Sequence, residues 1–382
     1  METSVSSVSP TSESSIAIQP VARRAVPRAE RPFGLYDLTL PQLTEKLTEA
    51  GFPAFRAKQV WTWAYHQLVD DYAQMTNLPA SLREWLIANL PLVLMRPVRE
   101  IATDGGDTYK LLYETKDGQF VETVLMLYSE RATVCVSCQV GCAVGCAFCA
   151  TGLGGLTRNL TTGEMVQQTV DSARRAKALG RTLTNLVMMG MGEPLQNYAA
   201  SIAFLKTLND PDGFGFGARR MTVSTSGIVP RIDALAEEPL QLNLAVSLHA
   251  PNDELRSRLV PVNQRWPIAE LLAACDRYTE KTGRRISFEY ALMSGINDAD
   301  EIALELAALL RGRLCHVNII PFNPVDVLKF ERPTPAGIEH FAETLRGAGI
   351  PATVRYSRGV DIGAACGQLR ARHEATKQEV SL

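Results

Sequence analysis

Three cysteines in one short segment are the residues of this chain whose spacing most clearly indicates chemistry. Cys142, Cys146 and Cys149 stand in the order Cys-x3-Cys-x2-Cys. Thiolates are soft ligands that suit iron–sulfur clusters and zinc, so the segment could close around one metal centre. A structural zinc ion takes four ligands, whereas a [4Fe–4S] cluster held by three cysteines keeps one iron open to a substrate. The number of cysteines therefore favours the cluster.

Two further cysteines leave other interpretations open. Cys135 and Cys138 precede the segment, so five cysteines occur within fifteen residues. A zinc site could use these two as well, and the chain would then be a zinc-stabilised RNA-binding protein without catalysis. Small buried thiols packed in a core are the remaining alternative, but such crowding of cysteines is not a core pattern.

Composition and charge limit the class of protein. The chain has 382 residues, 46% of them hydrophobic, which is ample for one large domain plus a small one. Its formal net charge is −2, so any contact with nucleic acid must come from local basic patches. Cysteines grouped in a metal-like pattern indicate a reducing compartment. No secretory leader pattern and no run of about 18 apolar residues is present, so we expect a cytoplasmic protein without a membrane segment.

The remaining chain divides into regions of different periodicity, which must position the cysteines. We expect strands to alternate with helices after the cysteine segment, with strands at 185–189, 220–225, 242–248, 286–292, 316–320 and 352–356. Repeated β–α units predict an α/β fold, a partial (β/α)6 barrel with helices outside. The predicted divisions are a disordered tail (1–31), a small helical accessory domain (32–92), β-hairpin linker strands (93–128), the barrel with a C-terminal catalytic loop (129–370) and a flexible tail (371–382).

Polar side chains and glycines stand at the expected carboxyl ends of the strands, where barrels carry their chemistry. Gly192 would let the backbone approach a ligand closely, and the Glu193 carboxylate could take an ammonium group. Hydroxyl, imidazole and amide groups follow at later strand ends, on Ser224, Ser247, His249 and Asn323. Each is weak on its own, because Gly-Glu-Pro is also an ordinary turn and a single histidine is more often structural.

Two longer stretches carry a resemblance to a known family. The cysteine segment, with Phe148 before its last cysteine, resembles the signature of radical S-adenosylmethionine (SAM) enzymes. The stretches 135–142 and 149–161 resemble the dual-specificity RNA adenine-C2 methyltransferases of the RlmN family. The resemblance extends from about Leu35 to the region of Cys366. It implies a radical SAM barrel preceded by a small helical domain that assists RNA recognition.

The resemblance also implies cofactors and their ligands. Cys142, Cys146 and Cys149 would hold a [4Fe–4S] cluster, and two molecules of SAM would be consumed per turnover. By resemblance, the SAM pocket would be lined by Gly192, Glu193, Ser224, Ser247, Leu248, His249 and Asn323.

Three catalytic roles are implied by the same resemblance. Cys366 would become an S-methylcysteine intermediate, Glu122 would act as general base, and Cys135 would resolve a protein–RNA adduct through a transient disulfide with Cys366. The sequence alone would favour a free cysteine at 366 and a solvated strand residue at 122. Position 138 is cysteine where the family usually has serine, and a harmless replacement by another small residue is the favoured interpretation. Cys138 could also be a competing resolving thiol or an additional metal ligand.

The implied reaction is methylation of C2 of adenine 2503 in 23S rRNA and of adenine 37 in tRNAs. Adenine C2 is not nucleophilic, so direct transfer of a methyl cation has no reasonable route and a radical is needed. The nearest alternative is a related enzyme that methylates adenine C8 of 23S rRNA, which shares these motifs. The expected partners are RNA and a flavodoxin-like electron donor, and we expect a monomer. Candidate phosphate contacts are Arg158, Arg219, Arg220, Arg256, Arg258, Arg284 and Arg285. Taken singly, each of these arginines is more often a solvated surface group or an ion-pair partner.

Overall fold

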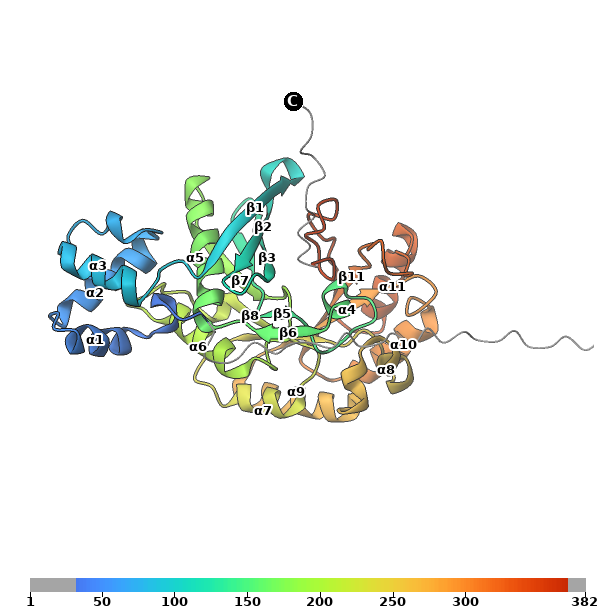
Figure 1. The fold of residues 1–382 in the computed structure, drawn as a ribbon. Helices are drawn as coiled ribbons and strands as arrows, with labels where there is room; N and C mark the ends of the chain where they lie inside the picture. The colour runs from blue at the N-terminus through green and yellow to red at the C-terminus, as the bar shows by residue number, and fades with distance from the viewer. Residues whose placement is uncertain (1–31, 370–382) are drawn as a thin grey trace, which may run out of the picture.

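The computed structural model describes residues 32–369, so the tails predicted at 1–31 and 371–382 lie outside the described residues. A small helical bundle comes first and projects to one side of the molecule (Figure 1). Its helices are α1 (Leu40–Glu49), α2 (Phe55–Thr62) and α3 (Ala80–Asn89). The Thr39 side chain accepts a hydrogen bond from the Gln42 N–H and Gln42 reaches back, a capping box that fixes the start of α1.

Two aromatic side chains contribute to the interior of this bundle. Trp61 and Tyr65 are buried, with ring centres 4.5 Å apart. Trp63 is only partly buried, and its indole N–H donates a hydrogen bond to the Asn77 side chain at 2.6 Å. The chain between α2 and α3 also contains a π-helical turn (Trp63–Gln67) and a 3-10 turn (Tyr72–Gln74).

A three-stranded antiparallel meander follows the bundle and continues into the barrel. Its strands are β1 (Met95–Thr103), β2 (Thr108–Thr115) and β3 (Phe120–Leu127), and β3 pairs antiparallel with β4 (Ala132–Cys135). The turn expected at residues 116–118 joins β2 to β3 and is closed by a 2.9 Å hydrogen bond from the Gly118 N–H to the Thr115 carbonyl. The three strands thereby extend one ten-stranded sheet.

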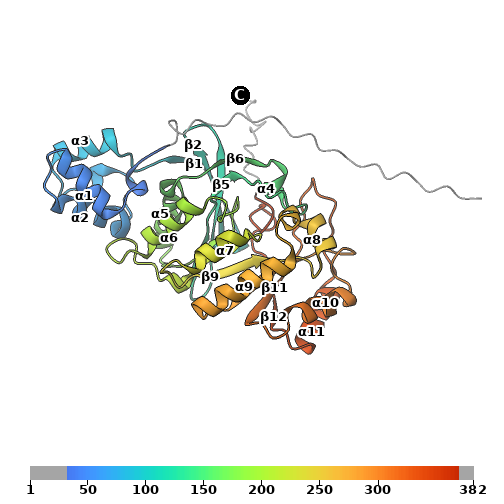
Figure 2. The same cartoon turned by 90° about the horizontal axis from the view of Figure 1, so that it is seen from below.

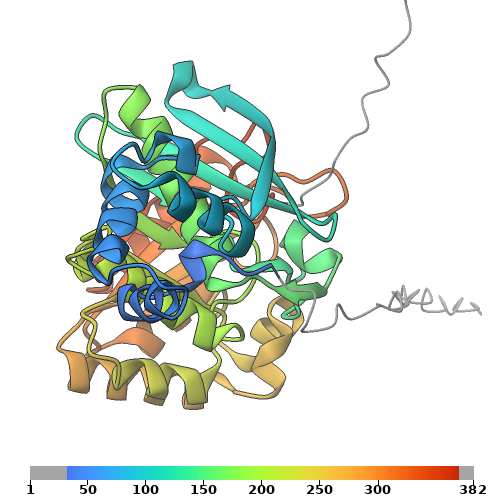
Figure 3. The ribbon, with the colours of Figure 1, turned by 60° about the vertical axis from the view of Figure 1, so that its left-hand side comes forward.

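The parallel part of the sheet forms a partial barrel. Beyond β4 its strands follow in chain order: β7 (Leu183–Met188), β8 (Met221–Thr225), β9 (Asn243–Ser247), β10 (Ile286–Leu292), β11 (Cys315–Pro321) and β12 (Ala352–Val354). Helices return the chain between them: α5 (Thr162–Ala178), α6 (Tyr198–Asn209), α7 (Val229–Ala236), α9 (Ile268–Thr282), α10 (Asp300–Leu310) and α11 (Pro335–Gly347). Figure 2 shows α7, α9, α10 and α11 on the outside of the strands, and Figure 3 shows the bundle and the meander from the side.

The predicted barrel is confirmed, with one strand more than the sequence indicates. The six strands expected after the cysteine segment are present, and β4 adds a parallel strand before it. This strand has four residues, all buried, so it shows no alternation of polar and apolar side chains. In residues 32–369 no helix combines the length and the apolar character needed to cross a bilayer.

Short elements around the cysteines were not predicted. A two-stranded ribbon, β5 (Gln139–Gly141) with β6 (Leu156–Asn159), closes the cysteine loop at its base, and α4 (Ala150–Leu153) follows the last cysteine. A side chain at Gly141 would place its Cβ only 1.8 Å from the Gly155 carbonyl oxygen, so the ribbon requires glycine there. Helix α8 (Asp253–Leu259) packs nearby, beside the end of β9.

Candidate active site

The three cysteines of the segment lie on one loop and line one cavity at the carboxyl ends of the parallel strands. The Cys142 N–H donates to the Gly155 carbonyl at 2.9 Å, which anchors the loop to its ribbon. Val144 is buried in a small apolar cluster, and the Phe148 ring meets the His249 ring edge-on at 4.6 Å. These contacts hold the loop while the three thiols remain partly accessible.

The donor set at this loop fits a thiolate-bound group. Burial raises the pKa of Cys142 to about 12, and it raises the pKa of Cys146 well above its usual value, with neighbouring thiols adding to both shifts. A cationic metal centre is what converts such buried thiols to thiolates. In the described part of the chain, no three His, Cys, Asp or Glu side chains converge as the ligands of a single metal ion do. The chemistry of three thiols on one cavity wall fits a cluster.

The same cavity gathers most of the side chains predicted at strand ends. It is lined, besides the cysteines, by Gly192, Glu193, Ser224, Ser247, His249, Asn323 and Cys366. Because parallel strands present their carboxyl ends at one edge, residues far apart in the chain meet there. The sequence therefore predicted the composition of this cavity, which we name the cofactor cavity.

Glu193 and Gly192 are fixed at this strand end by close contacts with neighbouring backbone and side chains. The Glu193 carboxylate accepts hydrogen bonds from the N–H of Ser226 (2.7 Å), the hydroxyl of Ser226 (2.8 Å) and the N–H of Leu195 (2.9 Å). Burial raises the pKa of Glu193, and these donors oppose the rise. Gly192 has φ of +104°, and a Cβ there would lie 2.5 Å from the Cβ of Gln139, so only glycine fits.

Asn323 presents a buried acceptor without a protein partner. Its amide N–H₂ donates to the Ser357 hydroxyl at 2.9 Å and to the Cys366 carbonyl at 3.1 Å. Its carbonyl Oδ1 is buried and has no hydrogen-bond partner. A buried polar atom normally finds a partner, so this oxygen marks a place for a ligand donor such as an amino or hydroxyl group.

His249 is held as a neutral donor. The Ala291 N–H donates to Nδ1 at 2.9 Å, so the hydrogen of the neutral ring stands on Nε2. Burial, with a smaller contribution from Arg256, lowers the pKa of His249 to about 3. The ring therefore faces the cofactor cavity as a neutral imidazole at physiological pH.

The Arg256 guanidinium holds together the chain at the carboxyl ends of β8 and β9, a role that the sequence did not indicate. Its guanidinium is fully buried and donates to the carbonyls of Ser226, Ser247 and Leu248 at 2.7 to 3.1 Å, and to the Asn263 side chain. The prediction that Arg256 contacts phosphate is wrong, because no part of it reaches solvent. Nothing in its local sequence separates it from Arg258, which is exposed.

Arg158 is an ion-pair partner, the alternative that the sequence left open for it. It is buried and forms paired hydrogen bonds of 2.8 to 2.9 Å with Asp117 and with Glu164. These bonds tie the β2–β3 turn to the start of α5, so Arg158 cannot contact phosphate. Leu248, expected in the SAM pocket, has its side chain in the hydrophobic core and does not line the cofactor cavity.

Cys366 lies where two cavities meet. It lines the cofactor cavity and also a second cavity of about 500 Å³ within the barrel, which we name the barrel cavity. Cys135, from the end of β4, lines the barrel cavity too, and both cysteines are free thiols. Cys135 is buried, whereas Cys366 is exposed. Burial raises the pKa of Cys135, and partial desolvation of the Cys366 sulfur, with the nearby Glu289, raises the pKa of Cys366 to about 11. Glu289 from β10 lines both cavities and was not singled out from the sequence.

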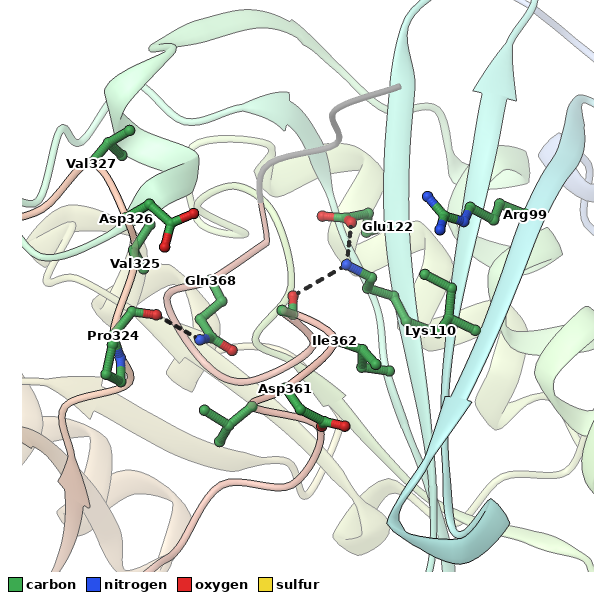
Figure 4. Close-up of a pocket in the computed structure, with 13 residues that line it drawn as sticks. Arg99, Lys110, Glu122, Pro324, Val325, Asp326, Val327, Asp361, Ile362 and Gln368 are labelled. Carbon is green, nitrogen blue, oxygen red and sulfur yellow. Dashed lines mark hydrogen bonds and ion pairs between the residues drawn. The ribbon is translucent and has the colours of Figure 1, made fainter. Parts of the chain in front are cut away.

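Glu122 lies on a third cavity, distinct from the two that Cys366 lines. This cavity, the hairpin cavity, has a volume of about 460 Å³ and lies between the β1–β3 meander and residues 360–368 (Figure 4). The Lys110 ammonium is 3.0 Å from Glu122 Oε1. Gly363 and Gln368 of the loop that carries Cys366 line the hairpin cavity, whereas Cys366 itself lines the other two cavities.

The remaining cysteines are buried. Cys138 is 2% exposed in the main hydrophobic core and lines none of the three cavities. Cys275 and Cys315 also pack in that core.

Comparisons with known proteins agree with this geometry. Residues 136–307 match the family model of the radical SAM superfamily, and residues 33–90 match that of the ribosomal RNA large subunit methyltransferase N-terminal domain. A probable dual-specificity RNA methyltransferase RlmN from Parafrankia sp. is 51% identical over 90% of this chain and 93% of its own length. The chain belongs to the RlmN family. It is thus a radical SAM RNA methyltransferase with the fold expected from the sequence.

Other members of the RlmN family and a solved structure extend the comparison. The probable RlmN of Chloroflexus aurantiacus is 49% identical over 89% of this chain and 93% of its own. The crystal structure of a radical SAM methyltransferase from Sphaerobacter thermophilus superposes with a TM-score of 0.89, at 63% identity, over 89% of this chain and 100% of its own. The family implies a [4Fe–4S] cluster and SAM, and the three thiols and Asn323, with its unpartnered Oδ1, line one cavity.

Proposed function

We propose that this RlmN-family enzyme methylates C2 of adenine 2503 in 23S rRNA and of adenine 37 in tRNAs, with Cys366 carrying the transferred carbon. The observation that supports this most is the position of Cys366, which lines the cofactor cavity together with Cys142, Cys146 and Cys149, and lines the barrel cavity together with Cys135. A thiol at that junction can receive a carbon on one side and be resolved by a second thiol on the other.

The cofactor cavity would hold both cofactors. The three cysteines would bind the cluster, and SAM would contact Glu193, His249 and Asn323, with Gly192, Ser224 and Ser247 beside it. When bound, the cluster and two SAM molecules per turnover supply the methyl group and the hydrogen-abstracting radical, and accept the electron that the RNA adduct loses. The unpartnered Oδ1 of Asn323 supports this assignment.

Cys366 would first be methylated on sulfur, losing its thiol proton. After loss of one hydrogen from that methyl group, the carbon would join adenine C2 and form a protein–RNA adduct. Glu122 would take the C2 proton as general base. The hairpin cavity beside Glu122 is large enough for a nucleotide, and the base must leave its stack to enter it. Movement of the loop that carries Cys366 would join this cavity to the others.

Cys135 would release the product. Its thiolate would attack the Cys366 sulfur, so that an S–S bond forms and the bond from sulfur to the transferred carbon breaks. The electron pair of that bond goes to the carbon, which takes a proton and becomes the methyl group of the RNA. The disulfide must then be reduced by an external thiol. The shared barrel cavity of the two free thiols supports this step.

Other parts of the proposal rest on the family alone. The helical bundle at residues 33–90 would assist RNA recognition, and a flavodoxin-like protein would donate electrons. RNA as substrate favours a cytoplasmic enzyme, and we propose that it acts as a monomer. Among the predicted phosphate contacts, Arg219, Arg220, Arg258 and Arg285 are exposed and stay candidates.

Nucleoside mass spectrometry tests the proposed reaction. Reconstituted holoenzyme is incubated without oxygen with reductant, SAM and either unmodified 23S rRNA fragments or tRNA transcripts. We expect 2-methyladenosine from both substrates. 8-Methyladenosine would instead assign the chain the C8 reaction, and the absence of any methylated adenosine with an intact cluster would contradict the proposal.

A further inference from the structure

Lys110 contacts both Glu122, the expected general base, and the loop that carries Cys366. Its ammonium is 3.0 Å from Oε1 of Glu122 and 3.4 Å from the carbonyl oxygen of Gly363 (Figure 4). Gly363 precedes Cys366 by three residues in the same loop. One side chain of β2 therefore connects the expected general base on β3 with the loop that carries the expected carbon carrier.

The environment of this contact makes it stronger than a surface ion pair. The side chains of Lys110 and Glu122 are 15% and 7% exposed. Exposed pairs contribute little because water screens them, whereas a sheltered charge that loses its partner is left poorly solvated. The ammonium therefore holds the Glu122 carboxylate beside the hairpin cavity.

The backbone keeps both contacts in register. β2 and β3 pair with Leu112 opposite Glu122 and Lys110 opposite Val124, so the two charged side chains lie diagonally on one face of the hairpin. On the loop side, Gly359 N–H donates to Asp104 Oδ2 at 3.1 Å, and Asp361 accepts from the Thr103 hydroxyl at 2.5 Å. The loop is thus fastened to the meander at its start, and Lys110 extends this attachment toward Cys366.

We propose that Lys110 is a positioning residue that holds the Glu122 carboxylate and the Cys366 loop in one arrangement during removal of the adenine C2 proton. The inference rests on the proposed function, because it assigns Lys110 to the base of that reaction. The step concerned is a proton transfer, in which the C2–H bond of the adduct breaks and the proton goes to Glu122. Methylation of Cys366 precedes this step and does not use Lys110.

The test follows the adduct as well as the product. Holoenzymes of the wild type, Lys110→Met, Lys110→Arg and Lys116→Met are reacted in single turnover with a 23S rRNA fragment and SAM. Lys116 is the matched control, since it is an exposed lysine at the turn of the same hairpin. Three quantities are measured: S-methylation of Cys366 before RNA is added, the covalent protein–RNA band on a denaturing gel, and released 2-methyladenosine.

We expect Lys110→Met to be methylated on Cys366 like the wild type and to accumulate the covalent band. Its release of product should be about 10- to 100-fold slower than that of the wild type. This loss is smaller than the roughly 10²–10⁴-fold that a general base contributes, because Lys110 acts through Glu122. Lys110→Arg should restore most of the release rate, and Lys116→Met should match the wild type. A merely structural defect would reduce methylation of Cys366 and adduct together.

Two results would overturn the inference while the proposed function stands. One is a rate of product release in Lys110→Met equal to that of the wild type. The other is a loss of Cys366 methylation in Lys110→Met that is not restored in Lys110→Arg. Failure of the wild type to form 2-methyladenosine would overturn the proposed function, and the role of Lys110 with it.

Discussion

Cys135 at the end of β4 and Cys366 in the C-terminal loop line the same cavity within the barrel, and neither is bonded to another cysteine. Cys138, only three residues from Cys135, is buried in the main core instead. The structure therefore separates two cysteines that the sequence left as competing candidates for the resolving thiol.

Replacement of Cys135 should trap the adduct. In Cys135→Ala no disulfide can form with Cys366, so a covalent protein–RNA species should accumulate and turnover should stop after one event. Cys138→Ser, the matched control, should release RNA at the wild-type rate. Denaturing gel electrophoresis with labelled RNA measures both. Trapping by Cys138→Ser, with normal release from Cys135→Ala, would exchange the two assignments.

Methylation of Cys366 should become faster as pH rises. Partial desolvation of the sulfur and the Glu289 carboxylate raise the pKa of Cys366 to about 11, so the thiol is protonated at neutral pH. The thiolate is the nucleophile, and below the pKa its fraction grows about tenfold per pH unit. Mass spectrometry of the protein after timed reaction with SAM, without RNA, should show this slope between pH 7 and 9.

Glu289→Gln tests the cause of that shift. Loss of the neighbouring negative charge should lower the pKa of Cys366 and raise the methylation rate at a fixed pH. A rate independent of pH in the wild type would show that thiol ionisation does not limit the step.

Removal of the Arg256 guanidinium should destabilise the barrel. Arg256→Met leaves the buried carbonyls of Ser226, Ser247 and Leu248 without their donor, and each such loss costs about 1–3 kcal/mol. The free energy of unfolding, from denaturant titration, should fall by roughly 3 kcal/mol or more. Arg258→Met, on an exposed side chain, should stay within about 0.5 kcal/mol of the wild type. Equal values for the two variants would refute the structural role of Arg256.

Asn323 should contribute directly to SAM affinity. Asn323→Ala removes the unpartnered Oδ1, and one lost hydrogen bond of about 1.4 kcal/mol weakens binding roughly tenfold. Equilibrium binding of SAM to the cluster-containing protein measures this. Ser357→Ala removes a partner of the Asn323 amide and keeps Oδ1, so its affinity should be near that of the wild type. Similar losses in both variants would mean that Asn323 acts only by anchoring the loop.

Local patterns predicted much of this protein. The alternation of strand and helix patterns predicted the barrel, because each outer helix presents one apolar stripe to the sheet. Strand ends such as Gly192-Glu193 and Asn323 were found because the order of strands in a parallel barrel brings their carboxyl ends together. The short strand β4 and helix α8 gave too few residues for a periodic signal.

Features set by tertiary contacts could not be predicted. Burial of Arg256 and Arg158 depends on carbonyls and carboxylates from distant segments, and their local sequence resembles that of surface arginines. The Lys110 contact with Glu122 and Gly363 joins a hairpin to a loop near the other end of the chain. The placement of Glu122 and Cys366 on different cavities is likewise a property of packing.

The central claim is that the carbon reaches RNA through Cys366, and an isotope label tests it most directly. Protein carrying a trideuterated methyl group on Cys366 is reacted with unlabelled SAM and 23S rRNA for a single turnover. We predict 2-methyladenosine that contains the carbon from Cys366 and keeps two of its three deuterium atoms. An unlabelled methyl group in the first product would show that the carbon passes directly from SAM, which contradicts this account.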